Sequence, residues 1–292
     1  MKTGITEKAM LVNLKISCWS ARKHDKSVSA KVAHDYNTPS DSGRYNKVLI
    51  AENAIKAIKK HVGNARTFHY ENTLPWNDEG SRILPAKNFD RYSQKMRELK
   101  TEYETAVSEF LKNYTSLVEN AKIRLNGMFK DSDYPGINEI RNKFSFTTII
   151  NPIPNNDDFR VSLNSTEVER IKTELGNRLR EAEKFAKKDL WNRLYSVLNS
   201  LSSKMREEGK NGKSPIFRDS LIGNVKDIVN LLPDLCISED PDLEKIRTEI
   251  KETIATMNPE DLRKTTNEER GKAARKAESI MDKMSDFMGG ME

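Results

Sequence analysis

The chain has 292 residues, of which 32% are charged and 36% hydrophobic, and its mean hydropathy is −0.75. This high ratio of surface to core fits long, thin helices better than a globular α/β enzyme, which needs more apolar residues. The net charge of +6 permits attraction to nucleic acid or to an acidic partner, but 50 basic residues stand among 44 acidic ones, which indicates a mostly mixed, solvated surface.

Neither a membrane span nor a secretion signal is found in the sequence. No stretch approaches the roughly 20 apolar residues that cross a bilayer, and residues 1–13 have no signal-peptide pattern. Cys18 and Cys236 lie far apart, which favours two unpaired thiols in a reducing compartment over one disulfide. We therefore expect a soluble, intracellular protein without membrane contacts.

Residues 1–89 are expected to form a basic N-terminal region with a short strand and a helix. Residues 11–17 alternate apolar and polar side chains, which predicts a half-buried strand. Residues 48–62 place Ile55, Ile58 and Val62 on one side of a helix. Two prolines and a glycine in residues 70–89 predict ordered but irregular chain.

Residues 90–209 are expected to form a long helical arm. Apolar side chains recur at alternating spacings of four and three from Tyr92 to Met128, and a second such run extends from Val168 to Met205. Two long helices with narrow apolar faces are most simply an antiparallel hairpin, in which each helix buries the face of the other. The same spacing would also serve self-association, because heptads do not distinguish a hairpin from a dimer.

Between the two runs, the sequence predicts a small β-hairpin at the tip of the arm, over about residues 143–163. Two shorter helices are expected within residues 210–257, and residues 258–292 are expected to be a charged, partly mobile tail. The fold class is thus mainly α with minor β: an elongated protein with a long antiparallel helical hairpin and a β-tip, a small N-terminal α/β region and C-terminal helices.

Residues 209–214 read GKNGKS, which resembles the end of a phosphate-binding loop. That loop needs four residues between its first glycine and the final Gly-Lys-Ser, so that backbone N–H groups can surround a phosphate. Here only two residues intervene, and Glu207 stands where the first glycine should be. The segment is therefore interpreted as a loop that ends the arm, without an ATP site.

Other catalytic and metal-binding patterns are equally weak. The histidines His24, His34, His61 and His69 have no i, i+4 pair and no CxxC beside them. No Gly-x-Ser-x-Gly motif is present. We expect no catalytic residues, no metal and no cofactor; an enzyme of unrecognised type remains a third hypothesis.

Basic clusters near aromatic side chains give the clearest binding signal, because cations contact a phosphate backbone and aromatic rings stack on bases. The candidate nucleic-acid-binding residues are Arg22, Lys23, Lys26, Lys31, Lys56, Lys59, Lys60 and Arg66. A solvated lysine-rich surface is the alternative interpretation of the same residues.

Five segments resemble a phage and bacterial family catalogued as domain of unknown function 3150. They are GRYNKVLI (43–50), ARTFHYENTLPWNDEGSRILPAKNF (65–89), DSDYPGINEIRNKFSF (131–146), DFRVSL (158–163) and FRDSLIGNV (217–225). The resemblance covers roughly residues 8–255 and is most distinctive at TLPW, residues 73–76. It implies a phage or mobile-element origin and hence the host cytoplasm. It also implies gene neighbours that encode MoxR-type AAA+ ATPases and von Willebrand-type domain proteins, but no assigned activity and so no catalytic residues.

The first functional hypothesis is a phage-encoded, non-enzymatic helical scaffold or adaptor that acts through protein–protein contacts, with an AAA+ ATPase system as a candidate partner. Its partner-binding residues would be those of the β-tip: Phe144, Phe146, Ile149 and Phe159. The alternative is a DNA-binding or DNA-end-protecting accessory protein that uses the N-terminal basic clusters. Homo-oligomerisation is compatible with both.

Overall fold

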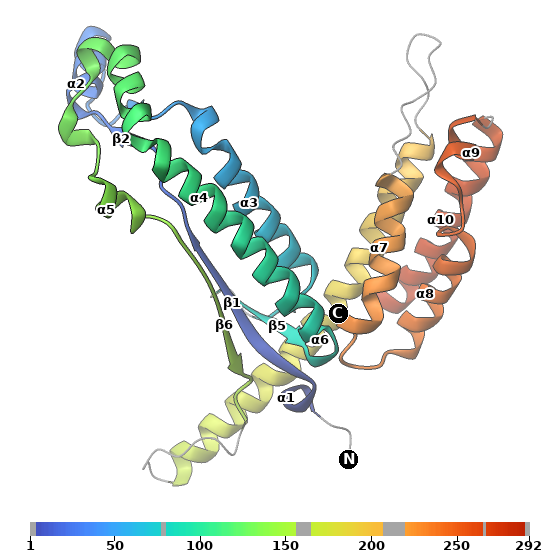
Figure 1. Cartoon of the computed structure of the whole chain (residues 1–292). Coiled ribbons are helices and arrows are strands. Elements are labelled where there is room, and N and C mark those ends of the chain that lie inside the picture. The colour runs from blue at the N-terminus through green and yellow to red at the C-terminus, as the bar shows by residue number, and fades with distance from the viewer. Residues whose placement is uncertain (1–3, 77–79, 156–164, 207–219, 265–266, 290–292) are drawn as a thin grey trace. The chain divides into compact units, whose positions relative to one another are not determined.

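The computed structural model describes residues 4–76, 80–155, 165–206, 220–264 and 267–289. The protein is mainly α-helical with a small β-sheet, as expected. It divides into two compact units, and the chain passes between them four times (Figure 1). Unit 1 comprises Met1–Asn13, Glu71–Asp90 and Ile150–Glu292, and unit 2 comprises Leu14–Tyr70 and Arg91–Ile149.

Unit 1 begins with part of a sheet of strand order β4-β5-β1-β6. The first residues of β1 (Ala9–Ser17) pair antiparallel with β5 (Ser81–Pro85), and β4 (Leu74–Pro75) pairs with the other edge of β5. The strand expected over residues 11–17 is thus confirmed. The expectation of irregular chain over 70–89 is wrong, because both prolines, Pro75 and Pro85, stand at strand ends, where a missing N–H is tolerated.

Helices make up the rest of unit 1. They are α1 (Ile5–Lys8), η1 (Ala86–Asn88), α6 (Ser165–Arg206), α7 (Ser220–Leu235), α8 (Pro241–Thr253), α9 (Pro259–Lys264) and α10 (Asn267–Gly289). One hydrophobic core joins α6, from Ala182 onward, to α7, α8 and α10 and to the inner face of the sheet. The long helix expected over the run from Val168 to Met205 is confirmed as α6.

Helix α10 belongs to this core. Ala274, Ala277 and Met284 are fully buried, and the carboxylate of Glu278 accepts hydrogen bonds from Ser202 Oγ at 2.7 Å and from Arg206. The expectation of a mobile tail is therefore wrong for the residues of α10, because their apolar side chains recur at helical spacing and cover α6.

Unit 2 is built on two antiparallel helices. α3 (Glu52–Glu71) lies beside α4 (Phe89–Leu125), since His61 Nδ1 is 3.2 Å from Glu102 Oε2 and His69 Nδ1 is 2.7 Å from Tyr92 Oη. The other elements of unit 2 are β2 (Arg22–His24), α2 (Lys26–Asp35), β3 (Asn46–Val48), η2 (Asn126–Met128), η3 (Asp131–Asp133) and α5 (Ile137–Arg141). β6 (Ser145–Pro152) starts in this unit and lies beside β1 in the sheet.

The expected hairpin between the two long helices is wrong. α4 and α6 belong to different units, and each covers its apolar face within its own unit: α4 against α3 and an aromatic cluster, α6 against α7 and α10. Periodicity identified both helices and their buried faces, but it does not encode which surface covers a face.

The β-tip is also different from the expectation. Its first strand exists as β6, but β6 joins the sheet beside β1. Phe146 is buried against Tyr103, with ring centroids 5.6 Å apart, and Phe144 packs at 5.7 Å on Phe110. Ile149 is half-buried, and Phe159 lies outside the described residues. Two of the four predicted tip side chains are therefore part of the packing of unit 2.

Candidate nucleic-acid interface

Positive charge is concentrated in unit 2. This unit carries 21 Lys and Arg residues against 12 Asp and Glu residues, a net charge of +9, whereas unit 1 has 29 against 32 and is net negative. The +6 of the whole chain thus conceals two units of opposite sign. A compact body with this excess of cations attracts polyanions at a distance.

Four of the predicted cations form one row on α3. Lys56, Lys59, Lys60 and Arg66 recur at helical spacing, so they share one flank of the helix, while Ile55, Ile58 and Val62 face the core. We call these four residues the α3 cation row. All four are exposed, and residues 53–70 contain no Asp or Glu. The row is therefore a continuous cationic stripe about 15 Å long.

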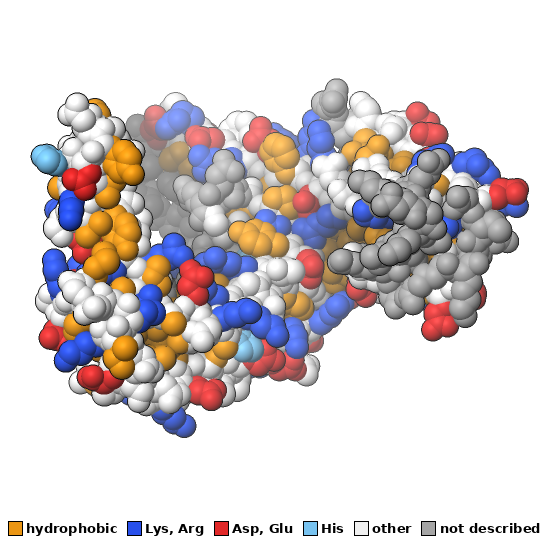
Figure 2. Space-filling model, turned by 90° about the horizontal axis from the view of Figure 1, so that it is seen from above, with side chains coloured by type: hydrophobic (Ala, Val, Ile, Leu, Met, Phe, Trp, Pro, Cys, Tyr) orange, Lys and Arg blue, Asp and Glu red, His pale blue; other side chains and the backbone are white. Residues whose placement is uncertain are grey.

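Nothing in the described part of the chain neutralises or covers the row. None of its four side chains makes an ion pair with a described residue. A Cβ built on Gly63, which stands on the same flank, would have no atom within 4 Å. Figure 2 shows Lys and Arg side chains interspersed with Asp and Glu side chains over the face in view. The flank is open to a ligand.

Cations elsewhere on long helices behave differently. On α4, Lys95 pairs with Glu98 at 2.9 Å and Lys100 with Glu104 at 3.7 Å. On α6, Arg170 lies 2.9 Å from Glu167 and the guanidinium of Arg178 lies 3.2 Å from Glu174. Such i, i+3 and i, i+4 ion pairs stabilise a solvent-exposed helix face. No such pair joins a side chain of the α3 cation row to a described residue, so all four of its charges are available to a ligand.

The second predicted cluster divides into two kinds of residue. Arg22 binds Glu52 at 2.5 Å, and Lys23 binds Asp133 at 2.9 Å, so both have partners in the fold. Lys26 and Lys31 lie exposed on α2, which has no buried residue, and make no ion pair with a described side chain. The structure thus leaves six of the eight predicted cations available to a ligand.

A buried lysine, which sequence reasoning missed, holds this region together. Lys47 Nζ lies 2.5 Å from Asp133 and 3.2 Å from Asp25, and also donates to the carbonyl of Met128 at 2.9 Å. Burial lowers the pKa of Lys47, but its hydrogen bonds to the two carboxylates outweigh this effect and leave the pKa above its usual value. The sequence offers one signal: the Asp-x-Ser pattern of an N-cap at Asp25, which accepts from the N–H groups of Ser27 and Val28.

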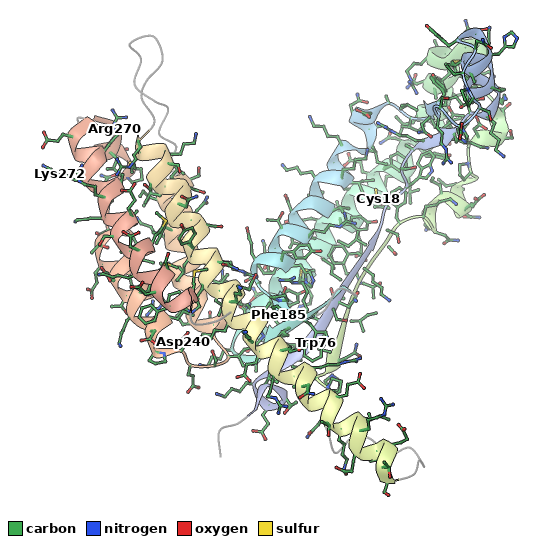
Figure 3. All side chains as sticks on the ribbon, turned by 180° about the vertical axis from the view of Figure 1, so that it is seen from behind. Cys18, Trp76, Phe185, Asp240, Arg270 and Lys272 are labelled. Carbon is green, nitrogen blue, oxygen red and sulfur yellow. The ribbon has the colours of Figure 1, made fainter. Side chains whose placement is uncertain are left out.

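Cys18, labelled in Figure 3, directly follows β1. Burial raises the pKa of its thiol, while the nearby charges of Lys59 and Arg66 act in the opposite direction. Both cysteines of the chain are free thiols. Cys18 is therefore a chemical reporter placed close to the row.

A groove of about 460 Å³ is the second feature of unit 2. Its lining combines apolar and aromatic side chains with charged ones: Tyr103, Val107, Leu111, Ile137, Phe144 and Phe146, and also Glu104, Lys112 and Arg141. Ile137 is 43% exposed. Two residues of the predicted tip, Phe144 and Phe146, thus line a concave apolar surface.

The histidines and the other catalytic or metal-binding candidates from the sequence do not come together in one site. His24 contacts Ser29, His34 is exposed, and His61 and His69 bond to α4. No three metal-ligating side chains come together in the described part of the protein. The GKNGKS segment falls outside the described residues. None of the described helices has the length and apolar character of a bilayer span.

No family model, no curated protein and no solved structure matches the chain.

Proposed function

We propose that this protein binds nucleic acid, without sequence preference, through the α3 cation row of unit 2. The observation that carries the proposal is that the four cations of the α3 row make no ion pair with a described residue, whereas several cations of α4 and α6 pair with acidic residues on the same helix. Keeping unpaired like charges on one flank costs stability unless a ligand supplies the opposite charge.

The chemistry of the row favours a phosphate backbone over other anions. Phosphates along a nucleic acid strand are regularly spaced, so a stripe of four cations meets several of them at once and releases the counterions around them. Lys26 and Lys31 on α2 would add further contacts from the same unit. Lysine-rich contacts of this kind position a protein on a backbone but do not read bases.

Fluorescence anisotropy with labelled duplex and single-stranded oligonucleotides, measured between about 50 and 200 mM salt, tests this function. Lys59→Ala/Lys60→Ala should weaken binding and reduce the slope of log K against log salt by about 1.8 for duplex DNA, since each lost phosphate contact contributes about 0.9. The matched control is Lys95→Ala/Lys100→Ala, which removes the same charge from ion-paired positions on α4. Equal losses in both variants would show only a general charge effect and would contradict the proposed site.

A second function, a non-enzymatic scaffold or adaptor, is favoured by the groove in unit 2. Its apolar lining and the exposed Ile137 suit an apolar side chain of a protein partner. In the phage setting that the family resemblance implies, the partner would be a phage or host protein, with an AAA+ ATPase system among the candidates. The two functions use different surfaces of unit 2 and are separable by mutation.

A further inference from the structure

Tyr70 stands near the end of α3, one helical turn beyond Arg66, the last cation of the α3 cation row. Its side chain is 57% exposed. Tyr92 and Tyr103 of the same unit, by contrast, are almost fully buried, and their hydroxyl groups hydrogen-bond within unit 2. Packing thus accounts for those two rings, whereas more than half of the Tyr70 side chain faces solvent beside a row of cations.

Tyr70 lies on the same flank of α3 as the cations. Lys56, Gly63 and Tyr70 are seven residues apart, and seven residues make nearly two turns of an α-helix, so the three positions lie close to one line along the helix. Each step along this line is about 10.5 Å. The other cations of the row stand on the two sides of the line: Lys59, Lys60 and Arg66. An extended ligand that follows the cations therefore reaches the ring of Tyr70.

Gly63, at the middle of this line, leaves the backbone of the helix exposed. A glycine inside a helix is less favourable than alanine. A Cβ on Gly63 would have no atom within 4 Å, so no described neighbour requires the small side chain. The glycine does allow a ligand to lie close to the helix between the cations at the two ends of the row.

We propose that the ligand of the α3 cation row is single-stranded nucleic acid, one of whose bases stacks on the ring of Tyr70. This inference rests on the proposed function and names the ligand class of the same site. The cations contact the phosphates, Gly63 gives the strand room at the middle of the row, and Tyr70 supplies the stacking surface. Stacking of this kind tolerates any sequence, because every base has a π-face.

The ring favours a single strand over a duplex. In a duplex the bases stack on one another, and a side chain in a groove reaches only their edges. The cations of the row attract the phosphates of both forms, but only an unpaired strand can place the face of a base on Tyr70. The ring therefore adds affinity for the single strand alone.

The position of Tyr70 also favours a base over a protein side chain. Tyr70 projects from the convex surface of a helix, where it offers a flat ring and no hollow. An apolar side chain of a protein gains most from a concave site, such as the groove that Ile137 lines. A planar base gains its contact from a planar ring, and its phosphates bring the charge that the adjacent cations lack.

Fluorescence anisotropy of the full chain with four labelled probes of equal length tests the proposal: oligo-dT, oligo-U, a DNA duplex and an abasic DNA strand. We expect Tyr70→Ala to weaken binding of the preferred oligonucleotide by about fivefold or more, and to change binding of the duplex and the abasic strand by less than about twofold. Tyr70→Phe keeps the ring and should bind like the natural chain. The oligo-dT and oligo-U probes distinguish DNA from RNA, and preference for either fulfils the proposal.

The matched control is Tyr195→Ala, because Tyr195 is also exposed but belongs to unit 1. It should leave the affinity for every probe unchanged, and circular dichroism checks that each variant keeps its helical content. If Lys59→Ala/Lys60→Ala loses binding while Tyr70→Ala does not, the inference is wrong and the proposed function stands. An equal loss of oligonucleotide and abasic strand in Tyr70→Ala also overturns the inference. A natural chain that binds none of the four probes overturns both.

Gly63→Leu separates binding from stability. A leucine at this position should raise the midpoint of thermal unfolding, because it replaces a helix glycine at an open position. The same side chain should weaken binding of the single strand, because it fills the space in which the strand lies. A Gly63→Leu protein that binds the oligonucleotide as tightly as the natural chain would contradict the path of the strand along the row.

Discussion

The ammonium group of Lys47 lies 2.5 Å from the carboxylate of Asp133, and both side chains are buried. Asp25, at the N-terminus of α2, completes the group at 3.2 Å. These contacts attach α2, β3 and η3 to one another, although α2 itself buries no side chain. The positive charge of Lys47 is thus structural, whereas no described side chain forms an ion pair with the α3 cation row.

Lys47→Met should destabilise unit 2 by about 3 kcal/mol, because removing one member of a buried ion pair leaves the other charges without compensation. Urea unfolding followed by circular dichroism at pH 7 measures the loss. The control is Lys26→Met, because Lys26 lies in the same region but is exposed on α2. This substitution should change the free energy of unfolding by less than about 0.5 kcal/mol. Equal effects of the two substitutions would refute the structural role of Lys47.

Cys18 should report on ligand binding at the α3 cation row. Bound nucleic acid should slow alkylation of Cys18 by iodoacetamide and leave Cys236, in unit 1, unchanged as an internal control. Lys59→Glu/Arg66→Glu should also slow the reaction without ligand, because those two cations oppose the rise in the pKa of the thiol that burial causes. Mass spectrometry of the two cysteine peptides gives both rates. Protection of both cysteines to the same extent would argue against binding at the row.

Glu278 should contribute acid sensitivity to unit 1. Hydrogen bonds from Arg206, and then from Ser202, lower the pKa of Glu278 from 4.5 to about 2. A carboxyl with a lowered folded-state pKa stabilises the protein above about pH 4.5, and this contribution is lost as the pH falls towards 2. Glu278→Gln should therefore be less stable than the natural chain at pH 7, and the difference should narrow at pH 3. Thermal unfolding at the two pH values measures it; a constant difference would contradict the linkage.

Ile137→Asp should abolish protein capture by the groove without unfolding unit 2, because Ile137 is exposed at the groove and its replacement adds a charge to an apolar surface. Affinity purification from cells with nuclease treatment compares this variant with Lys59→Ala/Lys60→Ala. A protein partner lost only with Ile137→Asp supports the adaptor function. Partners retained by Ile137→Asp but lost after nuclease treatment would support nucleic-acid binding alone.

Hydrophobic periodicity by itself determined where the long helices lie and which faces they bury. α4 and α6 match the two periodic apolar runs to within three residues at each end, and the sequence pattern also identified the strand over 11–17 and the buried stripe of α3. These features are local: side chains three and four residues apart share a helix face whatever covers it. The sequence also grouped Lys56, Lys59, Lys60 and Arg66 as candidates, but it did not place Arg66 on the helix, because the expected helix ended at residue 62 and α3 continues to Glu71.

Tertiary structure alone decided what each face meets. α4 packs against α3 and aromatic side chains, and α6 packs against α7 and α10, while β6 pairs with β1. The sequence did not predict these partners, because an apolar stripe specifies that a face is buried but not which element buries it. The same holds for charge. Lys23 and Lys47 form ion pairs with a carboxylate distant in sequence, whereas no described side chain forms an ion pair with the α3 cation row. Only the tertiary structure distinguishes these two kinds of cation.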